Sequence, residues 1–255
     1  MLLQDKIAIV YGAGAVGRAI ARRYVREGAT VHLVNRSQPG LDKAVAEITA
    51  DGGTVSTAEL DATDEAAVAA YVDEVVAQHG RLDISFNVIG VDDVQGTPLA
   101  EMPIADIMKP IEKAVRTQLV TSQPAIKQMR TQHSGVILNF GGIGEPVKDY
   151  SIGGFQVALA ATDALRRQLA TELGVDGIRV NTVQTSGVVQ SVVEGYGDSP
   201  EGQEIRKMLI DSTVLKHETS YEDVGDAATL AASDLTRTMT GAALNMTCGS
   251  TLDWR

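Results

Sequence analysis

Short apolar segments alternate with longer segments of helical period along the chain, and this alternation limits the possible folds more than any other feature. Seven segments are rich in β-branched or apolar residues and are bounded by glycine or charged residues, as is typical of buried strands. They are KIAIVYG, TVHLVN, TVSTAEL, LDISFNV, GVILNF, GIRVNTV and AALNM. Between them, segments such as 15–28 and 64–80 place apolar side chains at helical spacing. The pattern predicts an α/β fold, a doubly wound parallel sheet of about seven strands with helices on both faces.

Composition favours a single domain over residues 1–255 and excludes several classes of partner. A chain of 255 residues that is 44% hydrophobic can bury one substantial core. The formal net charge of -11 would repel nucleic acid. No apolar run approaches the roughly 18 residues that cross a membrane, and Cys248 is the single cysteine, so we expect a cytoplasmic protein. The most irregular stretch lies within residues 185–217 and is interpreted as a flap or lid over a site.

Gly12, Gly14 and Gly17 form a G-x-G-x-x-G motif directly after the first apolar segment. In a dinucleotide-binding turn, the first glycine permits the tight turn and the second lets the backbone approach a pyrophosphate. The third lets the helix pack closely on the strand. A glycine turn that serves packing alone is the alternative, but here the motif follows a strand and opens an amphipathic helix. We therefore expect a dinucleotide site in a Rossmann-type sheet.

The end of the second predicted strand indicates which dinucleotide is bound. NAD-specific sites usually place an acidic residue about 20 positions after the glycine motif, where it binds the adenosine ribose. This chain has Asn35 followed by Arg36. An arginine can pair with the 2′-phosphate of NADP, and no carboxylate is present to repel that phosphate. The sequence favours NADP(H) over NAD(H), unless Arg36 is simply an exposed loop residue.

With these residues in view, the chain resembles the short-chain dehydrogenase/reductase family along almost its whole length. The matching segments, in order, are LDATD, FNVIG, GVILNFGGIG, ATELGVDGIRVNTV, and EDVGDAATLAASD followed by MTGAALNMTCG. The resemblance implies that Asp61, Asn87, Gly90 and Val188 contact the cofactor. It also implies a homodimer or homotetramer that assembles through the helices expected at 105–132 and 153–174.

The four side chains that carry catalysis in that family are absent from the matching positions. The family uses a tyrosine as general acid or base, a lysine that lowers the tyrosine pKa, a serine that polarises the substrate oxygen and an asparagine that completes a proton relay. Phe155 and Leu159 stand at the tyrosine and lysine positions, Gly142 at the serine position and Ala114 at the asparagine position. The chain is expected to be a divergent member to which the usual mechanism is not open.

Other residues could supply a proton instead. Tyr150 is the nearest phenol, but substituting for the missing tyrosine would require a shifted loop. Asp92, Asp93 and Glu145 follow strands, at the edge of the sheet where ligands bind. A carboxylate of raised pKa at this edge could act as general acid or base. Otherwise these residues are solvated in loops.

The histidines and the paired arginines of the chain suggest no chemistry. His32, His79, His133 and His217 have no spacing typical of metal ligands, so no metal site is predicted and they are interpreted as ordinary surface or strand residues. Arg166 and Arg167 are expected on a solvated helix face.

Two functions from different classes therefore stay open. One is an NADP(H)-linked oxidoreductase that transfers hydride by an atypical arrangement. The other is a non-redox enzyme of the cyclase or isomerase type, or a ligand-binding or regulatory protein on the same scaffold. Phe155, Leu159, Val188 and Val189 predict an apolar pocket floor, and with it a small, apolar substrate or ligand.

Overall fold

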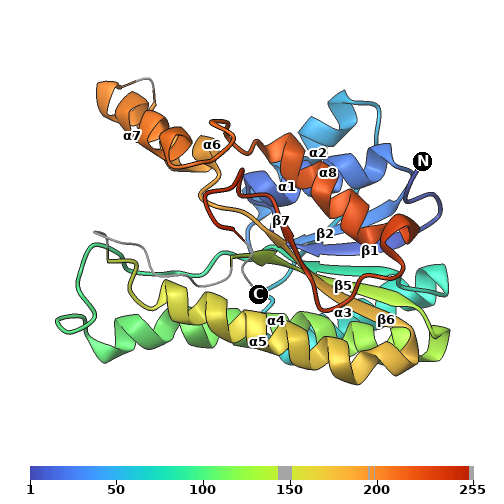
Figure 1. The fold of residues 1–255 in the computed structure, drawn as a ribbon. Coiled ribbons are helices and arrows are strands. Elements are labelled where there is room, and N and C mark those ends of the chain that lie inside the picture. Colours follow the sequence, from blue (N-terminus) through green and yellow to red (C-terminus); the bar gives the residue numbers. More distant parts are fainter. Residues whose placement is uncertain (143–150, 195, 198, 253–255) are drawn as a thin grey trace.

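The protein forms three layers, with a seven-stranded parallel sheet between two layers of helices (Figure 1). The structure, a computed structural model, describes residues 1–142, 151–194, 196–197 and 199–252. The strands are Ile7–Tyr11 (β1), Thr30–Asn35 (β2), Ser56–Glu59 (β3), Ile84–Asn87 (β4), Gly135–Gly141 (β5), Ile178–Gln184 (β6) and Ala243–Asn245 (β7). Their order is β3-β2-β1-β4-β5-β6-β7, and every neighbouring pair is parallel. The predicted doubly wound sheet is confirmed.

Helices cover both faces of this sheet, as the alternation of strands and helices predicts (Figure 1). One face carries α1 (Ala15–Arg26), α2 (Gln38–Ala50) and α8 (Tyr221–Ala232), and the other carries α3 (Glu65–His79), α4 (Ile104–Gln132) and α5 (Phe155–Leu173). Strand order reverses between β1 and β4, and in such sheets the crevice at the carboxyl ends of the strands at this point is where ligands bind.

The helix ends follow local chemistry. Asp64 caps α3 by accepting a hydrogen bond from the backbone nitrogen of Ala67, and Gly80 ends the same helix in a left-handed conformation with φ 75°. Ser220 and Asp223 form a capping box at the start of α8. The ends of these two helices are therefore set by residues within a few positions of each end.

The segment expected to be an irregular flap contains helices. Residues 185–217 include α6 (Val189–Val193) and α7 (Pro200–Asp211), which stand clear of the sheet at the upper left of Figure 1. Pro200 at the first turn and Ser199, whose hydroxyl accepts a hydrogen bond from the Gly202 nitrogen, explain why α7 begins there. The interpretation of this segment as a lid stays a prediction.

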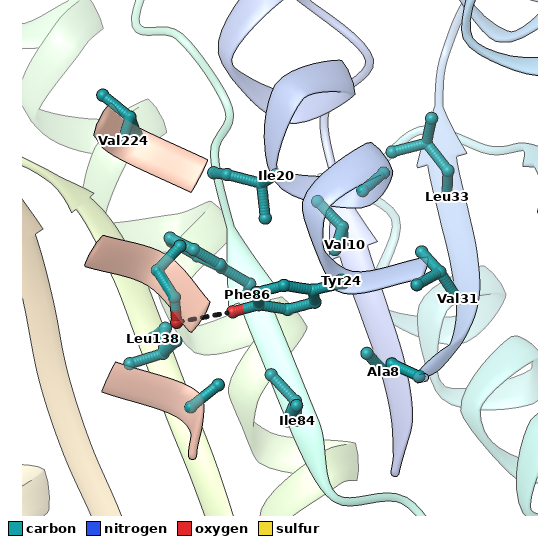
Figure 2. Packing of buried hydrophobic residues seen from close by; sticks show 14 of the residues in the cluster. Ala8, Val10, Ile20, Tyr24, Val31, Leu33, Ile84, Phe86, Leu138 and Val224 are labelled. Carbon is teal, nitrogen blue, oxygen red and sulfur yellow. Dashed lines mark hydrogen bonds between the residues drawn. The ribbon is translucent and has the colours of Figure 1, made fainter. Parts of the chain in front are cut away.

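The core on the α1 and α8 side is built around Tyr24 (Figure 2). Its ring is fully buried against the sheet, and its hydroxyl donates a hydrogen bond to the carbonyl oxygen of Ala228 in α8 at 3.1 Å. A buried phenol without a partner would be destabilising, so this bond fixes α8 against α1. Together the two helices cover the part of the sheet that includes β1, the strand that leads into the glycine turn.

A pair of histidines lies under the opposite face. His32 on β2 is buried, and its Nε2 is 2.9 Å from Nε2 of His79 at the end of α3, while its Nδ1 is 3.1 Å from the hydroxyl of Tyr71. His32 is a strand residue, as the sequence predicts, but its contact with His79 was not predicted and arises because the sheet brings β2 beside α3. Burial, followed by the charge of His79, lowers the pKa of His32 to about 4.

We expect the protein to lose stability as the pH falls from about 6.5 towards about 4. The unfolded chain takes up a proton at His32 near pH 6.5, but the folded protein resists that proton until about pH 4, so protonation favours unfolding within this window. The loss should be about 1–2 kcal/mol after allowance for solvent screening. Urea unfolding at several pH values, compared with the same series on His32→Gln, measures it. An unchanged pH dependence in the variant would contradict the assignment.

Candidate functional site

The turn between β1 and α1 has the geometry that the three glycines predict. Gly12 adopts φ +114°, and a Cβ there would lie 2.9 Å from the carbonyl oxygen of Val88. A Cβ at Gly17 would overlap the carbonyl oxygen of Gly12, whereas the space around Gly14 is open to 4 Å. Gly14 begins α1 without a side-chain cap, so the first amides of the helix are free to bind an anion. This turn fits a pyrophosphate.

The end of β2 presents a cation beside the predicted adenosine end. Arg36 is exposed, and no carboxylate pairs with it directly in the described part of the chain. Asp61 accepts hydrogen bonds from the nitrogen and hydroxyl of Thr63, which lower its pKa, and the charge of Arg36 adds to the effect. Asn35 donates to the carbonyl oxygen of Ser37 at 3.0 Å, so its amide holds the loop in which Arg36 sits.

At the end of β4, the side chain of Asn87 joins the loop after the strand to α4 by two hydrogen bonds. Its Oδ1 accepts a hydrogen bond from the nitrogen of Ile89 at 2.9 Å, and its Nδ2 donates to the hydroxyl of Thr117 on α4 at 3.2 Å. Gly90 follows with open space around it. Val188, buried at the start of α6, lies with Asn87 and Gly90 along the wall of one cavity.

This cavity, of about 1040 Å³, brings together the four positions that the sequence singled out as lacking catalytic side chains. Ala114 on α4, Gly142 after β5, and Phe155 and Leu159 on α5 all line it. A Cβ at Gly142 would come within 3.2 Å of Leu159 Cδ1, so the glycine leaves room for the branched leucine. Their match to the catalytic positions of a family stays a prediction.

Acid–base groups are scarce in the described cavity wall. Among the described residues that line it, Asp163 on α5 is the one with an ionisable side chain, and it forms ion pairs with Arg166 and, at 3.0 Å, with Arg167. Arg166 is only 5% exposed and also donates to the carbonyl oxygen of Gly241. The expectation that Arg166 lies on a solvated face is therefore wrong, because β6 and the turn before β7 cover that side of α5.

Of the four acid–base candidates that the sequence offered, the structure describes two, Asp92 and Asp93. Asp92 pairs with Lys113 at 2.9 Å, and this hydrogen bond lowers the pKa of Asp92, the reverse of what a general acid at neutral pH needs. Asp93 accepts a hydrogen bond from Gln95. Tyr150 and Glu145 lie outside the described residues.

The floor of the cavity is mixed, not apolar as the sequence predicts. Phe155, Leu159 and Val188 line it, but Val189 does not. Sequence reasoning missed the polar residues Gln118, Asn139 and Gln184, which also line it. A signal was present, because Asn139 interrupts the otherwise apolar strand β5 and Gln118 follows Ala114 by one helical turn, whereas Gln184 only ends β6.

The described part of the chain contains neither a metal-binding cluster nor a membrane-spanning helix. Within the described ranges, no three His, Cys, Asp or Glu side chains gather in a way that could hold a metal ion. None of the helices described has the length and apolar character needed to cross a membrane.

Comparisons with known proteins point in one direction. The family model for enoyl-(acyl carrier protein) reductase matches residues 12–251. Levodione reductase from Leifsonia aquatica is 29% identical over 231 residues, 89% of this chain and 86% of that protein. A crystal structure of levodione reductase has a TM-score of 0.85 at 25% identity and covers 96% of this chain and 97% of that one.

Two more proteins extend the likeness. 3α-Hydroxysteroid dehydrogenase from Mediterraneibacter gnavus is 29% identical over 249 residues, 96% of this chain and 97% of that protein. NAD⁺-bound xylitol dehydrogenase has a TM-score of 0.85 at 23% identity, with 98% of this chain and 100% of that one covered, which is a likeness of fold.

Proposed function

The chain belongs to the short-chain dehydrogenase/reductase family, and from this premise we propose that it binds NADP(H) and works as an oxidoreductase without the family's acid–base side chains. The observation that carries the proposal is the contrast between two ends of one site. The glycine turn is shaped for a pyrophosphate, whereas the described cavity wall offers Asp163 alone as an ionisable group.

The residues present fit the cofactor from its adenosine end inward. Arg36 would pair with the 2′-phosphate and Asp61 would hold the adenine. The free amides at the start of α1 would bind the pyrophosphate. Asn87, Gly90 and Val188 would surround the nicotinamide. When bound, the nicotinamide supplies the hydride.

The cavity residues would then position a substrate without exchanging a proton with it. Phe155 and Leu159 cannot ionise, and the carboxylate of Asp163 is held in ion pairs with two arginines. We expect slow turnover that relies on proximity, with the proton taken from solvent, from the substrate or from Tyr150. The names of the relatives, dehydrogenases and reductases, support redox chemistry over a cyclase or isomerase.

A ligand-binding role is the second candidate, and the shortage of acid–base groups favours it. Turnover separates the two candidates. Oxidation of NADPH by any member of a carbonyl panel supports the oxidoreductase, and tight NADPH binding without turnover supports the ligand-binding role.

We also propose assembly into a homodimer or homotetramer through α4 and α5. Support comes from exposed apolar side chains on these helices, with Ile104 78%, Met108 50% and Val157 43% exposed.

The cofactor preference is tested by Arg36→Ala. The variant should bind NADPH about 10- to 100-fold more weakly, since a charge-assisted hydrogen bond to phosphate contributes about 1.5–3 kcal/mol. NADH affinity should change little, because NADH lacks the 2′-phosphate. Calorimetric titration of both dinucleotides measures the difference, with Arg130→Ala, which removes an exposed ion pair to Asp176 at the far end of α4, as control. An equal loss for NADH and NADPH would contradict the 2′-phosphate assignment.

A further inference from the structure

Three buried amide side chains that line the cavity have polar atoms without a hydrogen-bond partner among the described residues. Gln118 belongs to α4, Asn139 to β5 and Gln184 to β6, and they are 2%, 7% and 1% exposed. All three line the cavity. Gln118 Oε1 and Nε2, Asn139 Nδ2 and Gln184 Oε1 make no hydrogen bond to any described residue. We call these three residues the amide cluster.

Sheet register explains why two members of the cluster face the same helices. Asn139 pairs with Thr182 and Gly141 with Gln184, so Asn139 and Gln184 project from the same face of adjacent strands, two residues apart along the ladder. Their sequence neighbours Leu138 and Val183 belong to the core on the α1 and α8 side. Asn139 and Gln184 therefore face the α4 and α5 side, where Gln118 is buried.

Amides buried without partners are unfavourable, and native proteins pair nearly all of them with protein groups, water or ligands. Here four such atoms gather beside one cavity of about 1040 Å³, which has room for far more than a few waters. The four atoms have almost no exposed surface in the structure. A ligand reaches them when the amides turn about their last side-chain torsion, which is broad for Asn and Gln.

We propose that the amide cluster recognises a neutral ligand group that carries a hydrogen-bond donor and acceptor side by side, namely the edge of a lactam, carboxamide or imide. Both the donor and the acceptor of Gln118 are free of hydrogen bonds to the described residues, so a cis-amide edge can accept from Nε2 and donate to Oε1 in one reciprocal pair. Asn139 adds a donor and Gln184 an acceptor. The assignment deepens the proposed function, because it names the substrate or ligand class of the same cavity.

Charged groups fit this cluster less well. A carboxylate only accepts hydrogen bonds and would face the carbonyl oxygens of Gln118 and Gln184 without satisfying them, and an ammonium group only donates. The one ionisable side chain on the described wall, Asp163, is already paired with two arginines and cannot balance a ligand charge. A simple ketone offers only an acceptor and leaves the Gln118 oxygen without a partner.

The test compares two ring-matched probes, 2-piperidone and cyclohexanone, by ligand-observed NMR titration of the full chain with and without saturating NADPH. The lactam should bind up to about tenfold more tightly, the effect of the one additional hydrogen bond that its N–H donates to the Gln118 oxygen. Gln118→Met, which keeps side-chain length but removes both polar atoms, should abolish the preference. Gln168→Met, the same change at an exposed position of α5, should retain it.

Thermal unfolding of the variants separates recognition from a structural role. Because Gln118 makes no hydrogen bond to the described protein, Gln118→Met should unfold at the same temperature or higher. Equal binding of the two probes by the unaltered protein, or a lactam preference that survives Gln118→Met, would overturn the proposal. So would a large drop in unfolding temperature with unchanged probe selectivity. Failure of NADPH to bind would instead count against the proposed function, because the probe comparison is made without NADPH as well.

Discussion

Adding one methyl group at position 17 should disrupt the protein far more than adding the same group at position 14. A Cβ at Gly17 would overlap the carbonyl oxygen of Gly12. Because the Cβ is fixed to the helix backbone and the oxygen belongs to the backbone of the turn, only a movement of α1 away from β1 relieves the overlap. We expect Gly17→Ala to lower the free energy of unfolding by about 3–5 kcal/mol, near the upper end for a single substitution. Dinucleotide binding should be lost with it, because the turn is rebuilt.

Gly14→Ala is the matched control for this effect. The space around Gly14 is open to 4 Å and its φ is -65°, so alanine fits the fold. Stability should stay within about 1 kcal/mol, but the methyl group would occupy the side from which a pyrophosphate approaches. Denaturant unfolding and NADPH titration of both variants measure the two effects. Similar stability of the two variants would show that the close helix–strand contact at Gly17 does not account for the predicted loss in the free energy of unfolding.

The sequence predicted the sheet and the geometry of the glycine turn well because their determinants are local. Each strand is a short apolar segment beside its own turn, and the three glycines act within one strand-to-helix connection. The same is true of Asp64 and Gly80, which begin and end α3 by contacts within a few residues. In these parts of the chain, spacing along the sequence corresponds directly to distance in the fold.

The sequence predicted contacts between distant elements less well, and the cavity wall is assembled from such elements. His32 and His79 are 47 residues apart and meet only because β2 lies beside α3. Arg166 looks like a surface residue in a helical pattern until the turn before β7, 75 residues later, covers it. The amide cluster combines α4, β5 and β6, and no local pattern shows that three amides will share one cavity. A polar residue within an apolar strand is the one signal available.

Placing the family's four side chains at the predicted catalytic positions should create a conventional carbonyl reductase. Phe155 and Leu159 lie one helical turn apart on α5, and both already line the cavity with Ala114 and Gly142. The variant Ala114→Asn, Gly142→Ser, Phe155→Tyr, Leu159→Lys would regain a general acid and the lysine that lowers its pKa. Because such groups typically contribute about 10²- to 10⁴-fold, NADPH-dependent carbonyl reduction should rise by at least about 100-fold over the unaltered protein.

Variants that carry only some of the four substitutions provide the controls. Gly142→Ser alone should be strained, because its Cβ would come within 3.2 Å of Leu159 Cδ1, and Leu159→Lys removes that branched end. A triple variant that keeps Phe155 should fold and bind NADPH but stay at the activity of the unaltered protein, since the phenol is the group that exchanges the proton. Steady-state kinetics on a carbonyl panel, with NADPH affinity measured in parallel, separates lost binding from lost chemistry. A quadruple variant that is folded and binds NADPH, yet reduces carbonyls no faster, would show that these four positions are not the catalytic ones.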